Sequence, residues 1–298
     1  MNAFGTFSFW IMLQSCQMDL DARPSPLAGR WYPAESRLLS DSVDGYIAAA
    51  QLPPIDERII AVVAPHAGHL YSGPVAGYAF AALRGLRPDL VVIVSPMHHP
   101  YAQPLLTSAH EAYQTPLGPI PIDRGAVQML SDTLTSELGF GLSAVRNDPE
   151  HSLEIELPFL QRALAAPFQL LPVMMREQSA RVSEILGRAL AKTLSARDVI
   201  LVASTDLSHF YSQDQAGGLD AEMLRQVEAF DPQGVIRIEE EGKGFACGRF
   251  ALAAVMWAAK ELGANRVRVL HHATSGDVTG DYLEVVGYGA AVITRSDN

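Results

Sequence analysis

Three histidines of this sequence each follow a short apolar run after a brief break. They are His66, His98 and His209, two, four and six residues beyond the ends of their runs, and Asp206 stands three residues before the last of them. In open α/β sheets the ligand crevice lies outside the carboxyl ends of the strands, so these side chains converge if the runs are strands of one sheet. Imidazole is the commonest metal ligand in proteins. The pattern predicts a metal-type site at this edge of the sheet.

Any one of these histidines would be weak evidence, because a turn residue more often serves local hydrogen bonding. No shared packing need explains imidazole in all three loops. His69 and His99 stand beside better-placed partners, and His99 is expected around the pocket rather than in the metal-ligand set. The other histidines fall in or near expected strands and are predicted to be structural: His110, His271 and His272.

Cys247 precedes Gly248 at the start of an apolar helical pattern. The positive end of a helix dipole lowers the pKa of a thiol and favours the thiolate, which binds metal or attacks carbon. The alternative is a small buried hydrophobic residue, the usual fate of a free cysteine. The flanking glycines, which permit close backbone approach, favour a functional Cys247.

A charged cluster opens another expected helix at Glu150, where His151 and Glu154 are three residues apart and would share a helix face. If functional, they would orient the strand-end histidines or act as an acid/base pair. Alternatively, the cluster is a solvated first turn stabilised by the helix dipole.

The elements that must position these residues alternate along the chain. Continuous apolar, β-branched runs, typical of strands buried on both faces, cover 59–64, 90–94, 168–174, 199–203 and 267–271, with a long closing strand at 282–294. Helical patterns cover 74–83, 125–138, 152–166, 180–194, 218–230 and 248–262, and 104–122 is typical of a hairpin or flap. This order predicts a single α/β domain with a central, mostly parallel or mixed sheet flanked by helices.

Composition narrows the function classes. The 298 residues are 48% hydrophobic and 18% charged, which is ordinary for a globular domain. A net charge of −11 without a basic stripe disfavours nucleic acid and anionic membranes as partners. Two cysteines, Cys16 and Cys247, do not make a disulfide framework, so we expect a cytoplasmic protein.

The N-terminus carries an apolar stretch at 4–13 without a basic start or a small-residue cleavage site, and it is too short to span a bilayer. We therefore expect residues 1–22 to be an N-terminal extension, either disordered or the product of a start upstream of a natural one at Met18. The domain is expected to cover 23–298.

Five ordered motifs carry a family resemblance. They are Pro65-His66-Ala-Gly-His-Leu-Tyr71-Ser-Gly73, Ser95-Pro-Met-His98-His99, Glu150-His151-Ser-Leu-Glu154, Ser204-Thr-Asp206-Leu-Ser-His209 and Ala246-Cys247-Gly248-Arg249. From about Pro24 to Thr294 the chain resembles the Memo family, called AmmeMemoRadiSam system protein B in bacteria and archaea. The second motif usually reads Gly-Pro-Ser-His in that family and is Ser-Pro-Met-His in this chain.

The resemblance implies a fold similar to class III non-haem iron extradiol dioxygenases (LigB-like). It places His66, His98 and Cys247 in the metal-ligand positions and Asp206 and His209 in the pocket. We expect further pocket or supporting residues around them: Tyr71, His99, His151 and Glu154.

Extradiol dioxygenases of that fold bind iron(II) through two histidines and a carboxylate. Cys247 occupies the carboxylate's place in the resemblance. Thiolate is softer and more oxidisable, which shifts the preference towards copper(I), zinc or a redox role.

Three functions follow as hypotheses. The first is an iron- or copper-binding redox or oxygenase-like protein, with zinc as a further possible metal, in which His209 acts as acid/base and Asp206 orients it. The second is a metal-free enzyme with Cys247 as nucleophile, a histidine as base and Asp206 as its orienter. The third is a non-catalytic module that uses the pocket to bind a small molecule, a peptide or a modified side chain.

The family label also implies a partnership. It predicts a functional association with AmmeMemoRadiSam system protein A and with a radical SAM protein.

Overall fold

The computed structural model describes residues 20–176 and 179–296. Its helices are α1 (Ser36–Ala49), α2 (His69–Ala82), α3 (Arg124–Leu138), the 3₁₀ turn η1 (Glu154–Glu156), α4 (Leu157–Ala163), α5 (Ala180–Leu194), α6 (Gln213–Glu228), α7 (Pro232–Glu240), α8 (Arg249–Glu261) and α9 (Gly276–Thr279). Its strands are β1 (Ala22–Arg23), β2 (Arg58–Ala64), β3 (Leu90–Pro96), β4 (Leu105–Ser108), β5 (Ala112–Thr115), β6 (Gly118–Pro121), β7 (Ser143–Val145), β8 (Gln169–Met175), β9 (Val199–Ser204), β10 (His209–Tyr211), β11 (Arg266–Thr274) and β12 (Val285–Arg295).

The main sheet is mixed, as the sequence predicts. Its order is β10-β12-β2-β9-β3-β8-β4-β7, with β11 paired to β12. The central strands β2, β9, β3 and β8 are mutually parallel, whereas β12 pairs antiparallel with β2, and β4 with β8. The carboxyl ends of β2, β9 and β3 therefore lie side by side at one edge of the sheet. A small second sheet has the order β1-β5-β6.

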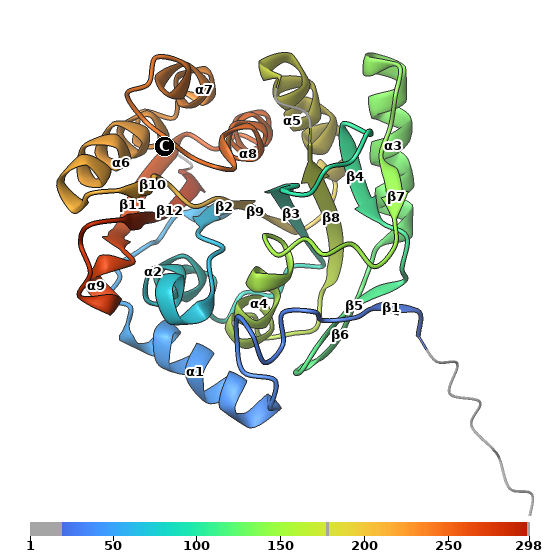
Figure 1. The fold of residues 1–298 in the computed structure, drawn as a ribbon. Helices are drawn as coiled ribbons and strands as arrows, with labels where there is room; N and C mark the ends of the chain where they lie inside the picture. Colours follow the sequence, from blue (N-terminus) through green and yellow to red (C-terminus); the bar gives the residue numbers. More distant parts are fainter. Residues whose placement is uncertain (1–19, 177–178, 297–298) are drawn as a thin grey trace, which may run out of the picture.

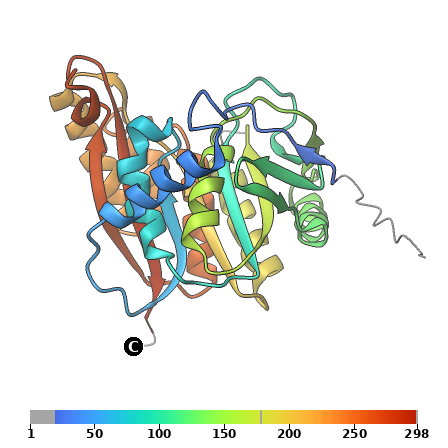
Figure 2. The same cartoon turned by 90° about the horizontal axis from the view of Figure 1, so that it is seen from below.

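Helices cover both faces of the main sheet. Helices α1, α2 and α4 lie on one face, and α3, α5, α6, α7 and α8 lie on the other (Figures 1 and 2). Because the central strands are apolar on both sides, successive residues enter different cores: Ala61 and Val63 pack with the second set of helices, Val62 and Ala64 with the first. A single α/β domain is the result.

The helix expected at 152–166 is shorter and begins later than the pattern suggests. A 3₁₀ turn at Glu154–Glu156 precedes α4, which ends at Ala163. His151 therefore lies before the helix, and the shared helix face predicted for His151 and Glu154 is wrong. Within the described residues, sequence patterning also missed the amphipathic helices α1 and α7 and the four-residue helix α9.

Two residues of the predicted extension contact the domain. Ala22 belongs to β1 and pairs in register with Ala112 of β5, and Asp21 forms an ion pair with Arg146. The rest of the predicted extension, residues 1–19, lies outside the described residues.

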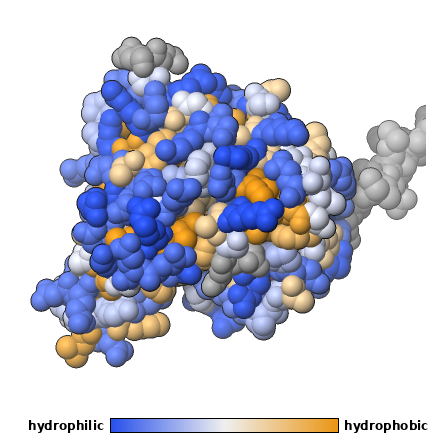
Figure 3. Space-filling model, turned by 90° about the horizontal axis from the view of Figure 1, so that it is seen from above, coloured by the Kyte–Doolittle hydropathy of each residue, from blue (hydrophilic) through white to orange (hydrophobic). Residues whose placement is uncertain are grey.

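Among residues 20–176 and 179–296, no helix combines the length and the apolar character needed to cross a bilayer. The face seen in Figure 3 is mostly hydrophilic, with apolar residues in small separate groups.

Candidate metal centre

His66 follows β2 and is fixed by the loop after the neighbouring strand β9. The Oδ1 of Asp206 accepts a hydrogen bond from the His66 backbone N–H at 2.7 Å, and His66 Nδ1 lies 2.9 Å from Ser204 Oγ. The Ser204 hydroxyl donates to the Ser152 carbonyl at 2.7 Å, so it accepts from Nδ1–H. This arrangement leaves His66 Nε2 unprotonated and available to a metal.

His98 follows β3 and is fixed by one carboxylate. Glu150 accepts the His98 backbone N–H at 2.6 Å with one oxygen and contacts His98 Nδ1 at 2.9 Å with the other. An ionised carboxylate only accepts, so Nδ1 carries the hydrogen and Nε2 is the free acceptor. Although burial opposes it, the hydrogen bond from His98 keeps the pKa of Glu150 well below its usual range.

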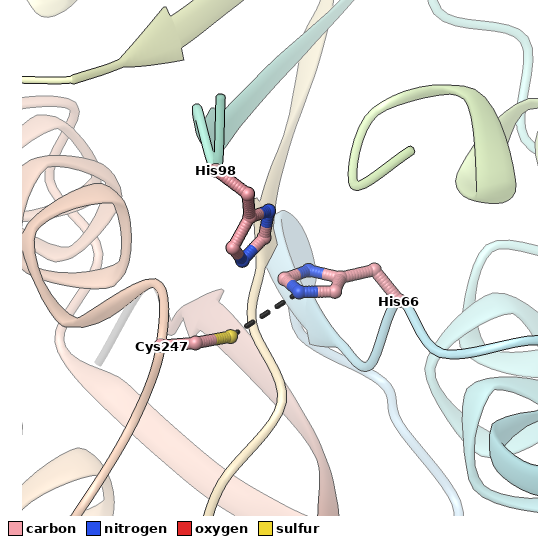
Figure 4. A group of neighbouring side chains, drawn as sticks. All are labelled: His66, His98 and Cys247. Atoms are coloured by element: carbon pink, nitrogen blue, oxygen red, sulfur yellow. Dashed lines mark hydrogen bonds between the residues drawn. The ribbon is translucent and has the colours of Figure 1, made fainter. Parts of the chain in front are cut away.

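Cys247 completes the group from the loop before α8. Its Sγ lies 3.2 Å from His66 Nε2, and the Asp206 backbone N–H donates to the same sulfur at 3.3 Å. One ligand atom from each of His66, His98 and Cys247 lies within 4.8 Å of the others, and the three side chains point at one another in Figure 4. Two free imidazole nitrogens and a sulfur fit a transition-metal ion such as iron, copper or zinc.

Further histidines surround this trio. His151 stacks on His98 with ring centroids 4.5 Å apart and meets His66 edge-on at 5.3 Å. His98, Glu150 and His151 form a second group of potential ligand atoms within 4.8 Å. Burial lowers the pKa of His151 to about 4, with the neighbouring imidazoles adding to the effect and the Glu150 carboxylate opposing it, so the His151 imidazole is neutral near pH 7.

In the metal-free chain, burial determines which groups of the centre are protonated. It raises the pKa of the Cys247 thiol, with the Asp206 carboxylate adding to the effect. The thiolate expected from the helix dipole is therefore not favoured in the metal-free chain, because desolvation outweighs the dipole. Burial also raises the pKa of Asp206 to about 7 and lowers that of His66.

His209 is oriented differently from the prediction. Its Nδ1 lies 2.7 Å from the carbonyl oxygen of Leu207, which can only accept, so Nδ1 carries the hydrogen. The Asp206 carboxylate instead accepts the hydrogen bond of the His66 backbone N–H. The expectation that Asp206 orients His209 is wrong, because the carboxylate turns towards the neighbouring strand end.

A cavity of about 490 Å³ lies against the centre. The polar part of its wall comes from Arg30, His66, His98, His151, Asp206 and His209. The remaining walls are largely apolar or aromatic and include Trp31, Leu70, Tyr71, Val286 and Tyr288. The structure thus brings the predicted Tyr71 and His151 to the pocket.

Two predicted pocket residues lie elsewhere. Glu154 is fully buried in an ion pair with Arg23 at 2.6 Å and accepts the Tyr32 hydroxyl at 2.6 Å, so it holds the N-terminal segment on the domain. His99 is not on the wall of the cavity in the part of the chain that the structure describes. The carboxylate that supports the centre is Glu150, which sequence reasoning left unassigned; its position beside His151 was the available signal.

Comparison with known proteins decides the family. A family model described as "Memo-like protein" matches residues 23–292. The chain belongs to the Memo family.

Relatives named "MEMO1 family protein" share about a third of their residues with this Memo-family chain. The protein of Nitrosopumilus maritimus is 32% identical over 272 residues, covering 90% of this chain and 98% of the relative. The Thermotoga maritima protein is 34% identical over 283 residues, covering 91% and 99%. A solved structure of an uncharacterized Escherichia coli protein, JW3007, has a TM-score of 0.49 at 16% identity and covers 78% of this chain and 99% of that one.

The Memo motifs are far apart in the sequence and meet in the fold. Hydrogen bonds join His66, Asp206 and Cys247 in one group and His98 with Glu150 in another, and Ser152 and Ser204 link the two groups.

Proposed function

We propose that this Memo-family protein binds one iron or copper ion, with zinc as a further possible metal, through His66, His98 and Cys247. The observation that carries the proposal is that hydrogen bonds fix the orientation of both imidazoles, those of His66 and His98. Ser204 and Glu150 occupy the two Nδ1 atoms, and both Nε2 atoms are left for a shared ligand beside a sulfur. Such supporting hydrogen bonds are typical of histidines that bind metals.

We further propose a redox or oxygenase-like role on a fold like that of extradiol dioxygenases. A bound iron or copper ion would supply Lewis acidity and one-electron chemistry. His209 lies in the cavity wall with Nε2 free, so it can accept a proton from a bound molecule and return it. Trp31, Tyr71 and Tyr288 would hold an apolar or aromatic part of that molecule and exclude water.

Metal-free cysteine chemistry is the second candidate, favoured by the 3.2 Å contact between Cys247 Sγ and His66 Nε2. A thiol this close to an imidazole resembles a nucleophile with its base. His66 Nδ1–H, however, donates its orienting hydrogen bond to Ser204 rather than to Asp206. The sulfur also lies within 4.8 Å of ligand atoms of two histidines, which is the grouping that a metal site requires. The metal-binding role therefore has the stronger support.

Metal content measured on anaerobically purified protein tests the proposal. We expect about one iron or copper ion per chain, and loss of it in His66→Ala, His98→Ala and Cys247→Ser, since three ligands define the site. His271→Ala is the matched control, because His271 stacks on Tyr78 away from the centre.

Each variant's melting temperature would be measured alongside, so that unfolding is separated from loss of the ion. Unchanged metal content in folded His66→Ala and His98→Ala proteins would refute the site.

A further inference from the structure

Glu156 is a buried acid that the proposed function leaves without a role. It ends η1 and is 0% exposed. One carboxyl oxygen, Oε1, lies 2.7 Å from the hydroxyl of Ser204, the residue that contacts His66 Nδ1. The other, Oε2, is buried without a hydrogen-bond partner in the part of the chain that the structure describes. A single hydroxyl group therefore connects this acid to a proposed metal ligand.

Glu156 has Ser204 where a buried acid usually has a cation. Glu154, two residues earlier and equally buried, pairs with Arg23 at 2.6 Å. For Glu156 the charged neighbour that affects the pKa is another acid, Asp206. Burial raises the pKa of Glu156 well above its usual range, Asp206 adds to the effect, and the contact with Ser204 opposes it. An unpaired buried charge is costly, so the fold favours the neutral acid.

The hydrogen bonds around Ser204 lead to the same protonation state. A serine hydroxyl donates one hydrogen bond and accepts two. The Ser152 carbonyl, 2.7 Å away, can only accept, so it takes the hydroxyl hydrogen. The other two neighbours of Ser204 Oγ, His66 Nδ1 at 2.9 Å and Glu156 Oε1 at 2.7 Å, must then both donate. An ionised Glu156 would compete for that one hydrogen and leave two oxygens 2.7 Å apart with none between them.

The two proposed histidine ligands therefore have partners of different charge. His98 Nδ1–H donates to the ionised Glu150, which strengthens this imidazole as a donor to a metal. His66 Nδ1–H donates to a hydroxyl that also accepts from a neutral acid. Because all three hydrogen-bonding positions of the hydroxyl are then occupied, it cannot rotate, and the ring that it holds is fixed with it.

We propose that Glu156 is a positioning residue that stays protonated at neutral pH and, through its hydrogen bond to Ser204, fixes the His66 ring with Nε2 towards the metal. It acts through the hydroxyl and not on the metal or a substrate. This inference rests on the metal-binding function proposed above. Its consequence is that position 156 requires a hydrogen-bond donor and not a negative charge.

Infrared spectroscopy of the metal-free full-length chain tests the proton. The carbonyl band of a protonated carboxyl group is separate from those of carboxylates and amides. At pH 8, above the pKa of about 7 of Asp206, we expect this band in the parent and its loss in Glu156→Gln. Glu137→Gln, at an exposed position of α3, is the matched control and should leave the band unchanged. Identical spectra of the parent and Glu156→Gln in this region would show that Glu156 is ionised and would overturn the proposal.

Zinc(II) affinity tests the positioning. Zinc has no redox chemistry, so competition with a colorimetric chelator measures binding alone. In Glu156→Met, which keeps a side chain of similar length without a donor, we expect about tenfold weaker binding, because supports of metal-binding histidines contribute about this much. Glu156→Gln restores a neutral N–H donor and should bind as the parent does. The melting temperature of each metal-free variant would show that it is folded.

The opposite results are distinct from one another. Parent-like affinity in folded Glu156→Met would show that the contact with Ser204 does not position His66. Equal weakening in Glu156→Gln and Glu156→Met would show that the charge matters rather than the donor, and either result would overturn the proposal. If the parent bound none of iron(II), copper(I) and zinc(II), the proposed function itself would be refuted, and this role with it.

Discussion

At the scale of single residues, the centre is defined as much by supporting groups as by its three ligands. Glu150 accepts hydrogen bonds from His98, His151 and Ser152 and is itself inaccessible to solvent. Ser204 fixes the orientation of the His66 ring in the same way, through its contact with Nδ1. The two imidazoles are thus oriented before any ion arrives, and this lowers the cost of binding one.

Replacing Glu150 by glutamine should weaken metal binding about 10- to 100-fold, because an amide offers one acceptor oxygen where the carboxylate offers two. Competition with a chelator of known affinity would measure the change. Glu137→Gln on the exposed side of α3 is the matched control and should bind as the parent does. Equal affinities for the Glu150→Gln variant and the parent would show that the carboxylate does not position His98.

His69 predicts a pH dependence of stability. Burial lowers its pKa to about 4, and its Nε2 lies 3.0 Å from the Ile155 carbonyl between the rings of Tyr32 and Phe159. The unfolded chain takes up this proton near the ordinary pKa of about 6.5, so the folded state loses stability as pH falls from there towards 4. The loss from this residue is roughly 2 kcal/mol at pH 5.

Urea unfolding at pH 7 and pH 5 would measure this dependence. In His69→Phe, which keeps an aromatic ring in the cluster, the difference between the two pH values should shrink by that amount. A variant with the parent's full pH dependence would show that other groups cause it.

At the scale of elements, close helix packing determines how α8, and with it Cys247, sits on the sheet. Helices α5 and α8 approach so closely that a β-carbon on Gly187 would lie 2.6 Å from the Ala254 carbonyl oxygen. Gly218 in α6 is also helical but has nothing within 4 Å of such an atom.

Gly187→Ala should therefore destabilise the protein by about 1 to 3 kcal/mol through overpacking. Gly218→Ala should stabilise it by about 0.5 to 1 kcal/mol, because alanine restricts the unfolded chain and favours helix. Chemical denaturation of both variants would compare them. The same sign of change in both would contradict the assigned packing.

At the scale of the whole molecule, the N-terminal segment is tied to the domain by one buried cation. Arg23 is 1% exposed and pairs with Asp148 at 3.0 Å and with Glu154 at 2.6 Å. These partners flank Glu150 in the sequence, so the same network braces the loop that positions His98.

Arg23→Met should cost about 3 to 5 kcal/mol, because two buried carboxylates lose their partner. Arg37→Met removes an exposed, weakly paired arginine of α1 and should change stability by less than about 1 kcal/mol. Thermal melts of the two proteins give the comparison, and similar losses would mean that the buried network is not stabilising.

Shortening the chain to begin at Met18 keeps Asp21, Ala22 and Arg23. Such a chain should melt within about 2 °C of the full one, since a lost contact of about 1 kcal/mol shifts a domain of this size by roughly 2 to 4 °C. Differential scanning calorimetry would detect a larger drop, which would show that residues before Met18 stabilise the domain.

The sequence by itself determined the central strands and the placement of three histidines after them. Hydrophobic runs and the breaks after them are local features, and parallel strands bring their carboxyl ends to one edge whatever the remaining packing. For that reason His66, His98 and His209 could be assigned to one place. Its position at a helix start made Cys247 a candidate, and the motif resemblance placed it with His66 and His98 as a metal ligand.

Only the tertiary structure decided which groups support the site. Glu150 reaches His98 across 52 residues, whereas Glu154, four positions later, is drawn to Arg23 across 131. Neither pairing leaves a periodic signal in the sequence. The protonation of Cys247 was also beyond sequence, because the dipole of a helix can be identified from its pattern, but the desolvation that outweighs it depends on what the fold places around the sulfur.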